Sequence, residues 1–369
     1  MILRFSGKRI SSLVTVVPQR EVKFEDEIGN FNFSPEKSLK LKKVMGFDRH
    51  RLVEGGTCAS DLCWQGMQYL FDNGHVQSGD VGGLIFVSQT PDYLIPPTSN
   101  LLQGKAGLSR DTFCLDINQG CAGFVIGLFQ AFMMLDLGCM KKVLLLNGDT
   151  LSRRVGRRDR NIYPMIGDAG SVTVVENDPD GGAITGFLQM DGSRGGALEI
   201  PAGGFRQPST AETAIEQDMG DGNFRSLDHF YMDGPAVFNF VQTEVPPMVR
   251  QLMEAAGTTT GEIDFFLFHQ PNKFMLEKLA SAMKVDKARV LSNVVENFGN
   301  SSSVTIPTNI AFNLRERLKT ETLRVCLAGF GVGLSWASMV IKLGPMDVCG
   351  LIEYPQGTGG PDFHRGATE

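Results

Sequence analysis

Cys121 lies where the sequence could place a nucleophilic thiol. The apolar run Phe113-Cys114-Leu115-Asp116-Ile117 predicts a short strand, and a helical pattern begins directly after Cys121. A thiol at a helix N-terminus meets the positive end of the helix dipole and unpaired N–H groups, which lower its pKa and favour the nucleophilic thiolate. The same local pattern also fits a small buried cysteine that fills a turn between strand and helix.

His269 and Asn300 occupy comparable places in the second half of the chain. His269 follows the apolar run Phe265-Phe266-Leu267-Phe268, and Asn300 follows a segment that begins at Val290 and is predicted to contain another strand. Because the carboxyl ends of parallel strands face one side of a sheet, both side chains can converge with Cys121. Each residue by itself also fits a capping or turn role.

A third polar site is predicted from backbone groups in the glycine-rich segment 329–336. Gly331 and Gly333 resemble part of a dinucleotide-binding fingerprint, but an apolar strand-like run, not a helix, follows them. Glycines here are better suited to let backbone N–H groups approach a ligand oxygen, as an oxyanion hole requires.

Composition narrows the classes of protein that the chain can belong to. The 369 residues are 42% hydrophobic, enough for a large core, and the net charge of −6 disfavours nucleic acid as the main ligand. We find no run of ~20 apolar residues for a membrane span and no secretory layout at the N-terminus, so we expect a cytoplasmic protein. The odd number of cysteines, seven, indicates free thiols, and no second pair with zinc-ligand spacing accompanies Cys58 and Cys63.

The chain also repeats itself. Similar segments recur at offsets of 182 (Gly79 and Gly261), 180 (Cys121 and Ser301) and 182 (Val143 and Val325). Repetition at a nearly constant offset indicates a duplication.

The duplicated pattern predicts the fold class. Short, continuous apolar runs suit strands that are buried on both faces, and the helical patterns between them indicate parallel-type sheets covered by helices. We therefore expect an α/β protein that forms a five-layer α/β/α/β/α sandwich, with halves at residues 1–185 and 186–343. Residues 154–163 and 203–230 are expected to be loops or lids, and residues 344–369 an extended surface tail.

Several motifs together resemble the β-ketoacyl-acyl carrier protein synthase III family of thiolase-fold condensing enzymes. They occur in the family's order and spacing across residues 40–343. The motifs are Asp116-Ile117-Asn118-Gln119-Gly120-Cys121, His269-Gln270-Pro271-Asn272, Gly299-Asn300-Ser301-Ser302-Ser303-Val304-Thr305-Ile306-Pro307 and the segment from Gly329 to Trp336.

The resemblance implies a homodimeric acyltransferase without a cofactor, acting in fatty acid or related lipid metabolism. Cys121 would accept an acyl group from acyl-coenzyme A or acyl carrier protein, with the backbone N–H groups of Cys121 and Val332 as the oxyanion hole. His269 and Asn300 would stabilise the enolate that forms when a malonyl thioester loses carbon dioxide, and the enolate would attack the acyl group. Further substrate contacts are expected from Gly331, Gly333, Phe238, Ile95, Met232, Arg157 and Arg158.

Some positions depart from the family's pattern. The family's adenine-stacking tryptophan before Met45 has no counterpart, an arginine that commonly follows the histidine motif is Phe274, and the motif's alanine is Pro271. Two basic clusters in this acidic chain could instead guide an acidic carrier protein or coenzyme A, although either could be an ordinary solvated surface. They comprise Lys37, Lys40, Lys42 and Lys43, and Arg153, Arg154, Arg157, Arg158 and Arg160.

The sequence is also compatible with other functions. An acyltransferase of the same fold could move the acyl group from Cys121 to a hydroxyl or amine, with His269 as the base. A degradative thiolase would need a second reactive cysteine in the glycine-rich segment, and a hydroxymethylglutaryl-type synthase would need a glutamate near residues 87–90; neither is present. A scaffold without activity is disfavoured because Cys121, His269 and Asn300 are all retained.

Overall fold

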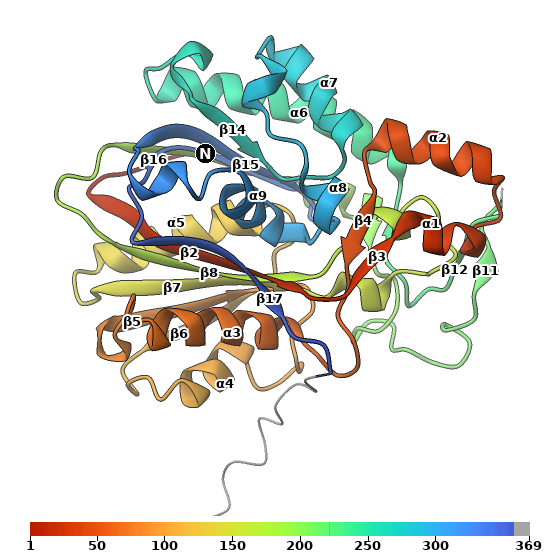
Figure 1. The fold of residues 1–369 in the computed structure, drawn as a ribbon, viewed down its shortest axis with the longest axis horizontal. Coiled ribbons are helices and arrows are strands. Elements are labelled where there is room, and N and C mark those ends of the chain that lie inside the picture. The colour runs from red at the N-terminus through yellow and green to blue at the C-terminus, as the bar shows by residue number, and fades with distance from the viewer. Residues whose placement is uncertain (221, 358–369) are drawn as a thin grey trace, which may run out of the picture.

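Two large β-sheets form the framework of the computed structural model, which describes residues 1–220 and 222–357 (Figure 1). In spatial order, the first sheet contains β17 (Val348–Tyr354), β2 (Lys8–Pro18), β8 (Ala169–Asn177), β7 (Lys142–Asp149), β5 (Val81–Val87) and β6 (Phe113–Ile117). The second contains β1 (Ile2–Phe5), β9 (Ile184–Met190), β16 (Ser335–Leu343), β15 (Leu323–Gly331) and β14 (Phe265–Phe268).

Helices complete five layers. Helix α5 is apolar on nearly all sides, as a helix enclosed between two sheets must be, and with α9 it shares one core with residues of both sheets. Two helices cover the outer face of each sheet, α3 and α4 on the first, α6 and α7 on the second. The bounds of these helices are α3 (Ala59–Asp72), α4 (Thr98–Lys105), α5 (Gly123–Asp136), α6 (Gly234–Ala255), α7 (Lys273–Met283) and α9 (Thr305–Asn313). The predicted α/β/α/β/α sandwich is confirmed.

The two sheets share a local topology, as the repeats predict, but they are mixed and not parallel throughout. β5 pairs in parallel with β7, and β14 pairs in parallel with β15. In both sheets the next strand, β8 or β16, is antiparallel. The expectation of parallel-type sheets therefore holds for the strands that lead to Cys121 and His269 and for one pair at the far edge of the first sheet, but not for the rest.

The predicted strand before Asn300 is wrong. The segment contains a short helix, α8 (Val294–Phe298), where the first half has β6. Asn300 instead forms an isolated parallel bridge with Ile166. The apolar run was short enough to suit either structure, and periodicity alone does not separate a short buried strand from a buried helical turn.

The two ends of the chain do not join the sheets built mainly from their own halves. β1, at the N-terminus, extends the sheet built mainly from the second half, whereas β17 pairs in parallel with β2 in the first sheet. The interpretation of residues 344–369 as a surface tail is thus wrong for β17, and residues 358–369 lie outside the described residues. The boundaries 1–185 and 186–343 stay a prediction.

Smaller elements collect at one end of the molecule (Figure 1). They are α1 (Phe24–Glu27), α2 (Pro35–Met45), the pair β3 (Glu21–Lys23) and β4 (Arg49–Arg51), the pair β10 (Leu198–Glu199) and β13 (Tyr231–Met232), and the pair β11 (Gln217–Asp218) and β12 (Phe224–Arg225). The described part of residues 203–230 is mainly loop, as expected.

Neither a spanning helix nor a metal cluster is found in the described ranges. No helix of residues 1–220 and 222–357 is long and apolar enough to cross a membrane. Within the same ranges, no group of three or more His, Cys, Asp or Glu side chains is arranged to hold a metal ion.

Candidate active site

Cys121 lies between the end of β6 and the start of α5, as the sequence predicts. The end of β15 passes so close that a Cβ atom on Gly331 would stand 2.8 Å from the Cys121 sulfur, and one on Gly329 would stand 2.6 Å from the Cys121 carbonyl oxygen. Any side chain at these positions would collide with the nucleophile. The glycines are therefore needed for the close approach of backbone to Cys121.

The expectation that Cys121 has a lowered pKa is wrong. The residue keeps partial exposure, but the protein around its sulfur is dense enough that burial raises the pKa of the thiol to about 11. Hydrogen bonds from the Val332 backbone and the Ser302 side chain act in the opposite direction without overcoming desolvation. The neutral thiol is therefore the predominant form at physiological pH.

The backbone N–H of Val332 points at the Cys121 sulfur, which is the place predicted for half of the oxyanion hole. Gly331 lies against Cys121, as described above. Gly333 is exposed, and its closest neighbours are atoms of Ser335, so it shapes the turn between β15 and β16 and does not touch the nucleophile. The Ser335 hydroxyl donates to the Val332 carbonyl oxygen at 2.8 Å and holds this turn.

His269 follows β14 and is buried, with 2% of its surface exposed. Its Nδ1 is 2.8 Å from the Thr305 hydroxyl, and burial lowers the pKa of the imidazole to about 3. The ring is therefore neutral at physiological pH, and it stands edge-on to Phe330 with 5.7 Å between ring centroids. A neutral imidazole can donate one hydrogen bond but is a weak base.

Asn300 is held by residues of the first half. Its backbone N–H donates to the Met165 carbonyl oxygen at 2.6 Å, and its own carbonyl oxygen accepts from Gly167 at 3.1 Å. A Cβ on Gly167 would lie 2.1 Å from the Phe298 carbonyl oxygen, so this crossing requires glycine. Asn300 Oδ1 accepts from the Ser302 N–H at 2.9 Å. Its amide nitrogen is thus left to donate into the adjoining cavity.

Ser302 links the three predicted residues and was missed by the sequence analysis as a functional residue. It is a non-glycine residue with a left-handed backbone (φ 55°). Its N–H orients Asn300, and its carbonyl oxygen accepts from the Thr305 hydroxyl at 2.9 Å. Its hydroxyl bonds to Gln89 Oε1 at 3.2 Å and acts to lower the pKa of the Cys121 thiol. Its position two residues after Asn300 in the quoted motif was the available signal.

Asp149, at the end of β7, is a second missed residue. Its side chain is fully buried, and Oδ1 accepts from the Gln89 N–H at 2.8 Å. Burial raises the pKa of this carboxyl to about 7. A charged residue three positions after the apolar run Val143-Leu144-Leu145-Leu146 could have been noticed by the same reasoning that selected His269.

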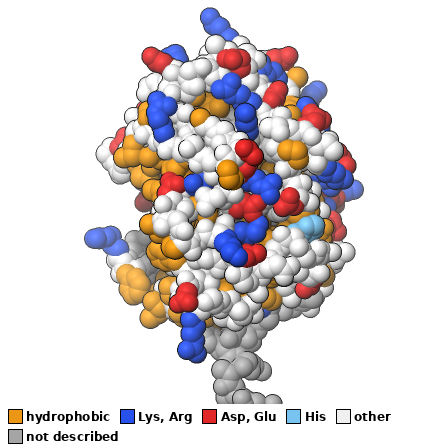
Figure 2. Space-filling view, turned by 90° about the vertical axis from the view of Figure 1, so that its left-hand side faces the viewer, with side chains coloured by type: hydrophobic (Ala, Val, Ile, Leu, Met, Phe, Trp, Pro, Cys, Tyr) orange, Lys and Arg blue, Asp and Glu red, His pale blue; other side chains and the backbone are white. Residues whose placement is uncertain are grey.

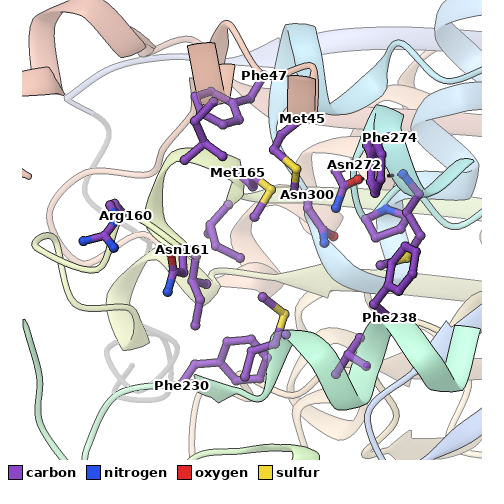
Figure 3. A pocket seen from close by; sticks show the side chains of 18 of the residues that line it. Met45, Phe47, Arg160, Asn161, Met165, Phe230, Phe238, Asn272, Phe274 and Asn300 are labelled. Atoms are coloured by element: carbon purple, nitrogen blue, oxygen red, sulfur yellow. Dashed lines mark hydrogen bonds between the residues drawn. The ribbon is translucent and has the colours of Figure 1, made fainter. Parts of the chain in front are cut away.

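A cavity of about 430 Å³ leads to Asn300 (Figure 3). Figure 3 shows Phe238 and Phe274 on one side, Arg160 and Asn161 on the other, and Asn300 between them. Two of the predicted contacts, Phe238 and Met232, line it. The other lining residues are Leu41, Met45, Phe47, Ile162, Met165, Ile166, Phe230, Gly234, Pro235, Val237, Pro271, Asn272 and Met275. Phe274, which replaces an expected arginine, stacks on Phe238 at 5.9 Å, so the cavity is mainly apolar with one cation.

The remaining predicted contacts lie elsewhere. Ile95 is 84% exposed, and the residues lining the cavity do not include it. Arg158 is exposed, lies 3.5 Å from Glu216 and stacks on the Phe224 ring. Arg157 lines a separate cavity with Arg20 and Tyr163. From the arginine cluster, Arg160 reaches the main cavity.

The four clustered lysines also differ from one another in their surroundings. Lys42 pairs with Glu25 at 2.6 Å and with Asp48, so it holds α2 in place. Lys37 lies over the Phe33 ring, and Lys40 and Lys43 are exposed.

Comparison with known proteins places these observations in a family. Two family models match: 3-oxoacyl-(acyl-carrier-protein (ACP)) synthase III at residues 115–192, and the C-terminal part of the same enzyme at residues 253–343. A protein of Campylobacter jejuni, provisionally named 3-oxoacyl-(acyl-carrier-protein) synthase 3, is 31% identical over 93% of this chain and 96% of its own. The β-ketoacyl-(acyl-carrier-protein) synthase III of Natranaerobius thermophilus is 32% identical over 80% of this chain and 88% of its own.

Solved structures agree. The crystal structure of a 3-oxoacyl-(acyl-carrier protein) synthase from Burkholderia xenovorans has 35% identity and a TM-score of 0.89, over 96% of this chain and 99% of that one. A second 3-oxoacyl-(acyl-carrier-protein) synthase III has 30% identity and a TM-score of 0.84, over 90% and 99% of the two chains.

Proposed function

We propose a course of reaction at Cys121 from the premise that this chain belongs to the 3-oxoacyl-(acyl-carrier-protein) synthase III family of condensing enzymes, which have the thiolase fold. In the first step, Cys121 attacks an acyl thioester and keeps the acyl group. The oxyanion of that step is held by the backbone N–H groups of Cys121 and Val332. Support comes from the direction of the Val332 N–H, which points at the Cys121 sulfur.

In the second step, a malonyl thioester loses carbon dioxide beside His269 and Asn300. The enolate oxygen accepts hydrogen bonds from the Asn300 amide and from the His269 ring, and its carbon attacks the acyl group on Cys121. The observation that carries this step is the bond from Ser302 N–H to Asn300 Oδ1, which turns the donating end of the amide to the cavity.

The Thr305 hydroxyl decides whether His269 can serve as that donor. This hydroxyl accepts from the Gln270 N–H at 3.3 Å and has one proton, which either the Ser302 carbonyl oxygen or His269 Nδ1 can take. When Nδ1 takes it, the proton of the neutral ring is on Nε2. The second step uses this tautomer.

The acyltransferase alternative is less well supported. Transfer to a hydroxyl or amine would need His269 as a general base, which works best with a pKa near the operating pH. Burial that lowers the pKa of His269 to about 3 suits a neutral donor and not a base.

We further propose that the donor arm enters through the cavity beside Asn300, with Phe238, Met232 and Phe274 against the arm and Arg160 near its phosphate. Arg157 and Arg158 would steer an acidic carrier protein to this end. On the end shown in Figure 2, opposite α1 and α2, acidic and basic side chains are interspersed, so that end would offer a carrier protein no comparable attraction. No cofactor is required by this chemistry.

The assembly and location are also proposals. Tyr93, Leu94 and Ile95 form an exposed apolar loop, and a homodimer would give it a partner surface. All seven cysteines are free thiols, which fits the reducing cytoplasm. Light scattering in solution tests the dimer.

The test of the reaction is the release of carbon dioxide from malonyl thioesters, measured together with the mass of the intact acylated protein. Acylation of Cys121 followed by carbon dioxide release and a β-ketoacyl product is expected. Acylation without carbon dioxide release with every malonyl donor would refute the condensing reaction. Transfer to an alcohol or amine, with a rate that follows the ionisation of His269, would support the acyltransferase instead.

A further inference from the structure

Asn300 lies outside the two large sheets, and one isolated bridge holds its backbone beside the cavity. The Asn300 N–H donates to the Met165 carbonyl oxygen at 2.6 Å, and the Gly167 N–H donates to the Asn300 carbonyl oxygen at 3.1 Å. The residue between these two partners, Ile166, lines the cavity together with Asn300. Whatever fixes the peptide groups on either side of Ile166 therefore also fixes Asn300.

The two backbone groups of Ile166 form their hydrogen bonds with residues other than Asn300. The Ile166 N–H donates to the Tyr163 carbonyl oxygen at 3.2 Å, and the Ile166 carbonyl oxygen lies 2.7 Å from His50 Nδ1. A peptide group is planar, so the Ile166 carbonyl and the Gly167 N–H can only turn together. His50 and Asn300 thus hold the same peptide group from its two ends.

This peptide group has little room to move. A Cβ atom on Gly299 would stand 2.6 Å from the Ile166 carbonyl oxygen and 2.7 Å from the Gly167 nitrogen. Gly299 also has a left-handed backbone (φ 79°), which favours glycine. Because the two segments are in direct backbone contact, a turn of the peptide between Ile166 and Gly167 would displace Gly299 and, with it, Asn300.

His50 is fixed in turn by a polar cluster. It lies on β4, is 2% exposed, and its Nε2 is 3.0 Å from Glu27 Oε2. Glu27 Oε1 accepts from the Tyr163 hydroxyl at 3.1 Å, and the Tyr163 ring stands edge-on to the imidazole with 5.5 Å between ring centroids. Each of the three side chains therefore contacts the other two. The cluster holds the imidazole with Nδ1 toward Ile166.

These contacts also determine where one ring proton lies. A carbonyl oxygen can only accept, so Nδ1 must carry the proton that it donates to Ile166. The contact between Nε2 and Glu27 then needs a proton of its own, which either the ring or the carboxyl can carry. In both cases Nδ1 is the donor to the backbone.

We propose that His50 is a positioning residue for the condensing step, because its Nδ1–H fixes the peptide between Ile166 and Gly167 and this peptide fixes Asn300. The residues that line the cavity do not include His50, so it acts through the backbone and not on the substrate. Glu27 and Tyr163 contribute by orienting the imidazole. The inference rests on the proposed role of Asn300 in the enolate step.

Two variants separate the backbone bond from the rest of the histidine. The amide nitrogen of asparagine can take the place of Nδ1, and that of glutamine can take the place of Nε2. His50→Asn should therefore keep the bond to Ile166, whereas His50→Gln should keep the contact with Glu27 and lose the bond to Ile166. The matched control is His75, which stacks on Tyr69 and does not line the cavity; His75→Gln should behave as the unmutated protein.

Hydrogen exchange measures the positioning of the backbone without any substrate. Peptides that contain the Gly167 and Asn300 amides should exchange slowly in the unmutated protein. His50→Gln should speed their exchange by about tenfold, because local opening no longer has to break the bond to His50, and His50→Asn should change it by less than about threefold.

Separate measurements of the two half-reactions show whether the positioning matters for catalysis. His50→Gln should slow the release of carbon dioxide from preformed acyl-enzyme by about 10–10²-fold, since a displacement of about 1 Å can have an effect of that size. Acylation of Cys121 should stay unchanged, because it does not use Asn300. His50→Asn should keep both rates within about threefold of the unmutated protein.

Several results would overturn the proposal. Equal exchange in His50→Asn and His50→Gln would mean that the ring matters and its Nδ1 bond does not. Exchange in His50→Gln at the unmutated rate, carbon dioxide release at the unmutated rate despite faster exchange, an equal loss of acylation, or the same changes in His75→Gln would also contradict it. If exchange changes as expected but the unmutated protein never releases carbon dioxide, the condensing function fails and the hold of His50 on Asn300 stands.

The unmutated protein provides a check that does not depend on the folding of His50→Gln. In nuclear magnetic resonance spectra of protein with nitrogen-15-labelled histidine, the ring signal that disappears in His50→Asn identifies His50. That signal should show a proton on Nδ1 at neutral pH. A bare Nδ1 would overturn the proposal by itself.

Discussion

The strand exits of the two halves occupy equivalent places but differ in chemistry. In the first half they carry groups that can lose or gain a proton near the reaction, Cys121 and Asp149. In the second half His269 follows a strand, whereas Asn300 follows the short helix α8 and Thr305 begins α9. All three are neutral hydrogen-bond donors or acceptors. In the proposed reaction the two halves would divide the work, the first forming the acyl-enzyme and the second stabilising the enolate.

Removal of the nucleophile should have the largest effect on this division. Cys121→Ala should accept no acyl group and lose condensation by roughly 10⁴-fold or more, as expected when a covalent nucleophile is deleted. Intact mass after exposure to acyl thioesters measures the first effect, and product formation the second. A label that persists on another cysteine with condensation intact would place the nucleophile elsewhere. The exposed Cys139 is the matched position, and Cys139→Ala should change neither quantity.

A change at Asn300 should separate acylation from condensation. Asn300→Ala should still acquire the acyl label on Cys121, because the oxyanion hole of that step lies in the backbone. Condensation should fall by about 10²–10³-fold, the usual loss for one donor to a developing oxyanion. Single-turnover measurements of acylation and of carbon dioxide release provide the two rates. Equal loss in both would mean that Asn300 serves the structure and not the enolate.

Asp149, in the first half, should also make the free energy of unfolding depend on pH. The folded-state pKa of Asp149 is raised to about 7, above its ordinary value, so the folded protein binds this proton more tightly than the unfolded chain. Its stabilising effect is therefore present at low pH and is lost as the pH rises through 7. At pH 8.5, Asp149→Asn should unfold at a higher temperature than the unmutated protein, with a free energy of unfolding larger by an amount on the order of 2–4 kcal/mol. At pH 4 the two proteins should differ little. An advantage that does not vary with pH would contradict burial of the charge as its cause.

Within the neutral half, Thr305 should have a moderate effect. Thr305→Val keeps the shape of the side chain but removes the hydroxyl that can donate to His269 Nδ1 and so leave the ring proton on Nε2. Condensation from preformed acyl-enzyme should slow by about tenfold, corresponding to one hydrogen bond of ~1.4 kcal/mol, while acylation stays unchanged. Thr305→Ser should restore the rate. Failure of Ser to restore it would point to packing of the methyl group.

The smallest effect should come from surface arginines that lie away from Cys121 and His269. Arg157→Glu with Arg158→Glu should weaken use of an acyl carrier protein substrate several-fold at low salt and leave a short thioester analogue unaffected, because surface charges act by steering. The difference should fade as salt is raised. An equal loss with both substrates would reflect a folding defect, and no loss would mean that the two arginines are bystanders.

Much of this protein was determined by the sequence alone. Continuous apolar runs located β5, β6, β7, β14 and β15, and the repeat at nearly constant offset matched β5 with β14 and β7 with β15. The polar residues at their ends then identified Cys121 and His269. Such features are local, since burial on both faces of a strand requires an apolar residue at every position, and local patterns can be read without the partner.

The tertiary structure decided what depends on residues far apart in sequence. It placed β17 beside β2, turned the segment before Asn300 into α8, and joined Ser302 to Asn300 and Thr305 by backbone hydrogen bonds. It also reversed the expected direction of the Cys121 pKa. The helix dipole that favours the thiolate is visible in the sequence, but the desolvation that opposes it comes from residues of both halves packed around the sulfur. Only the folded chain sets which of the two effects is larger.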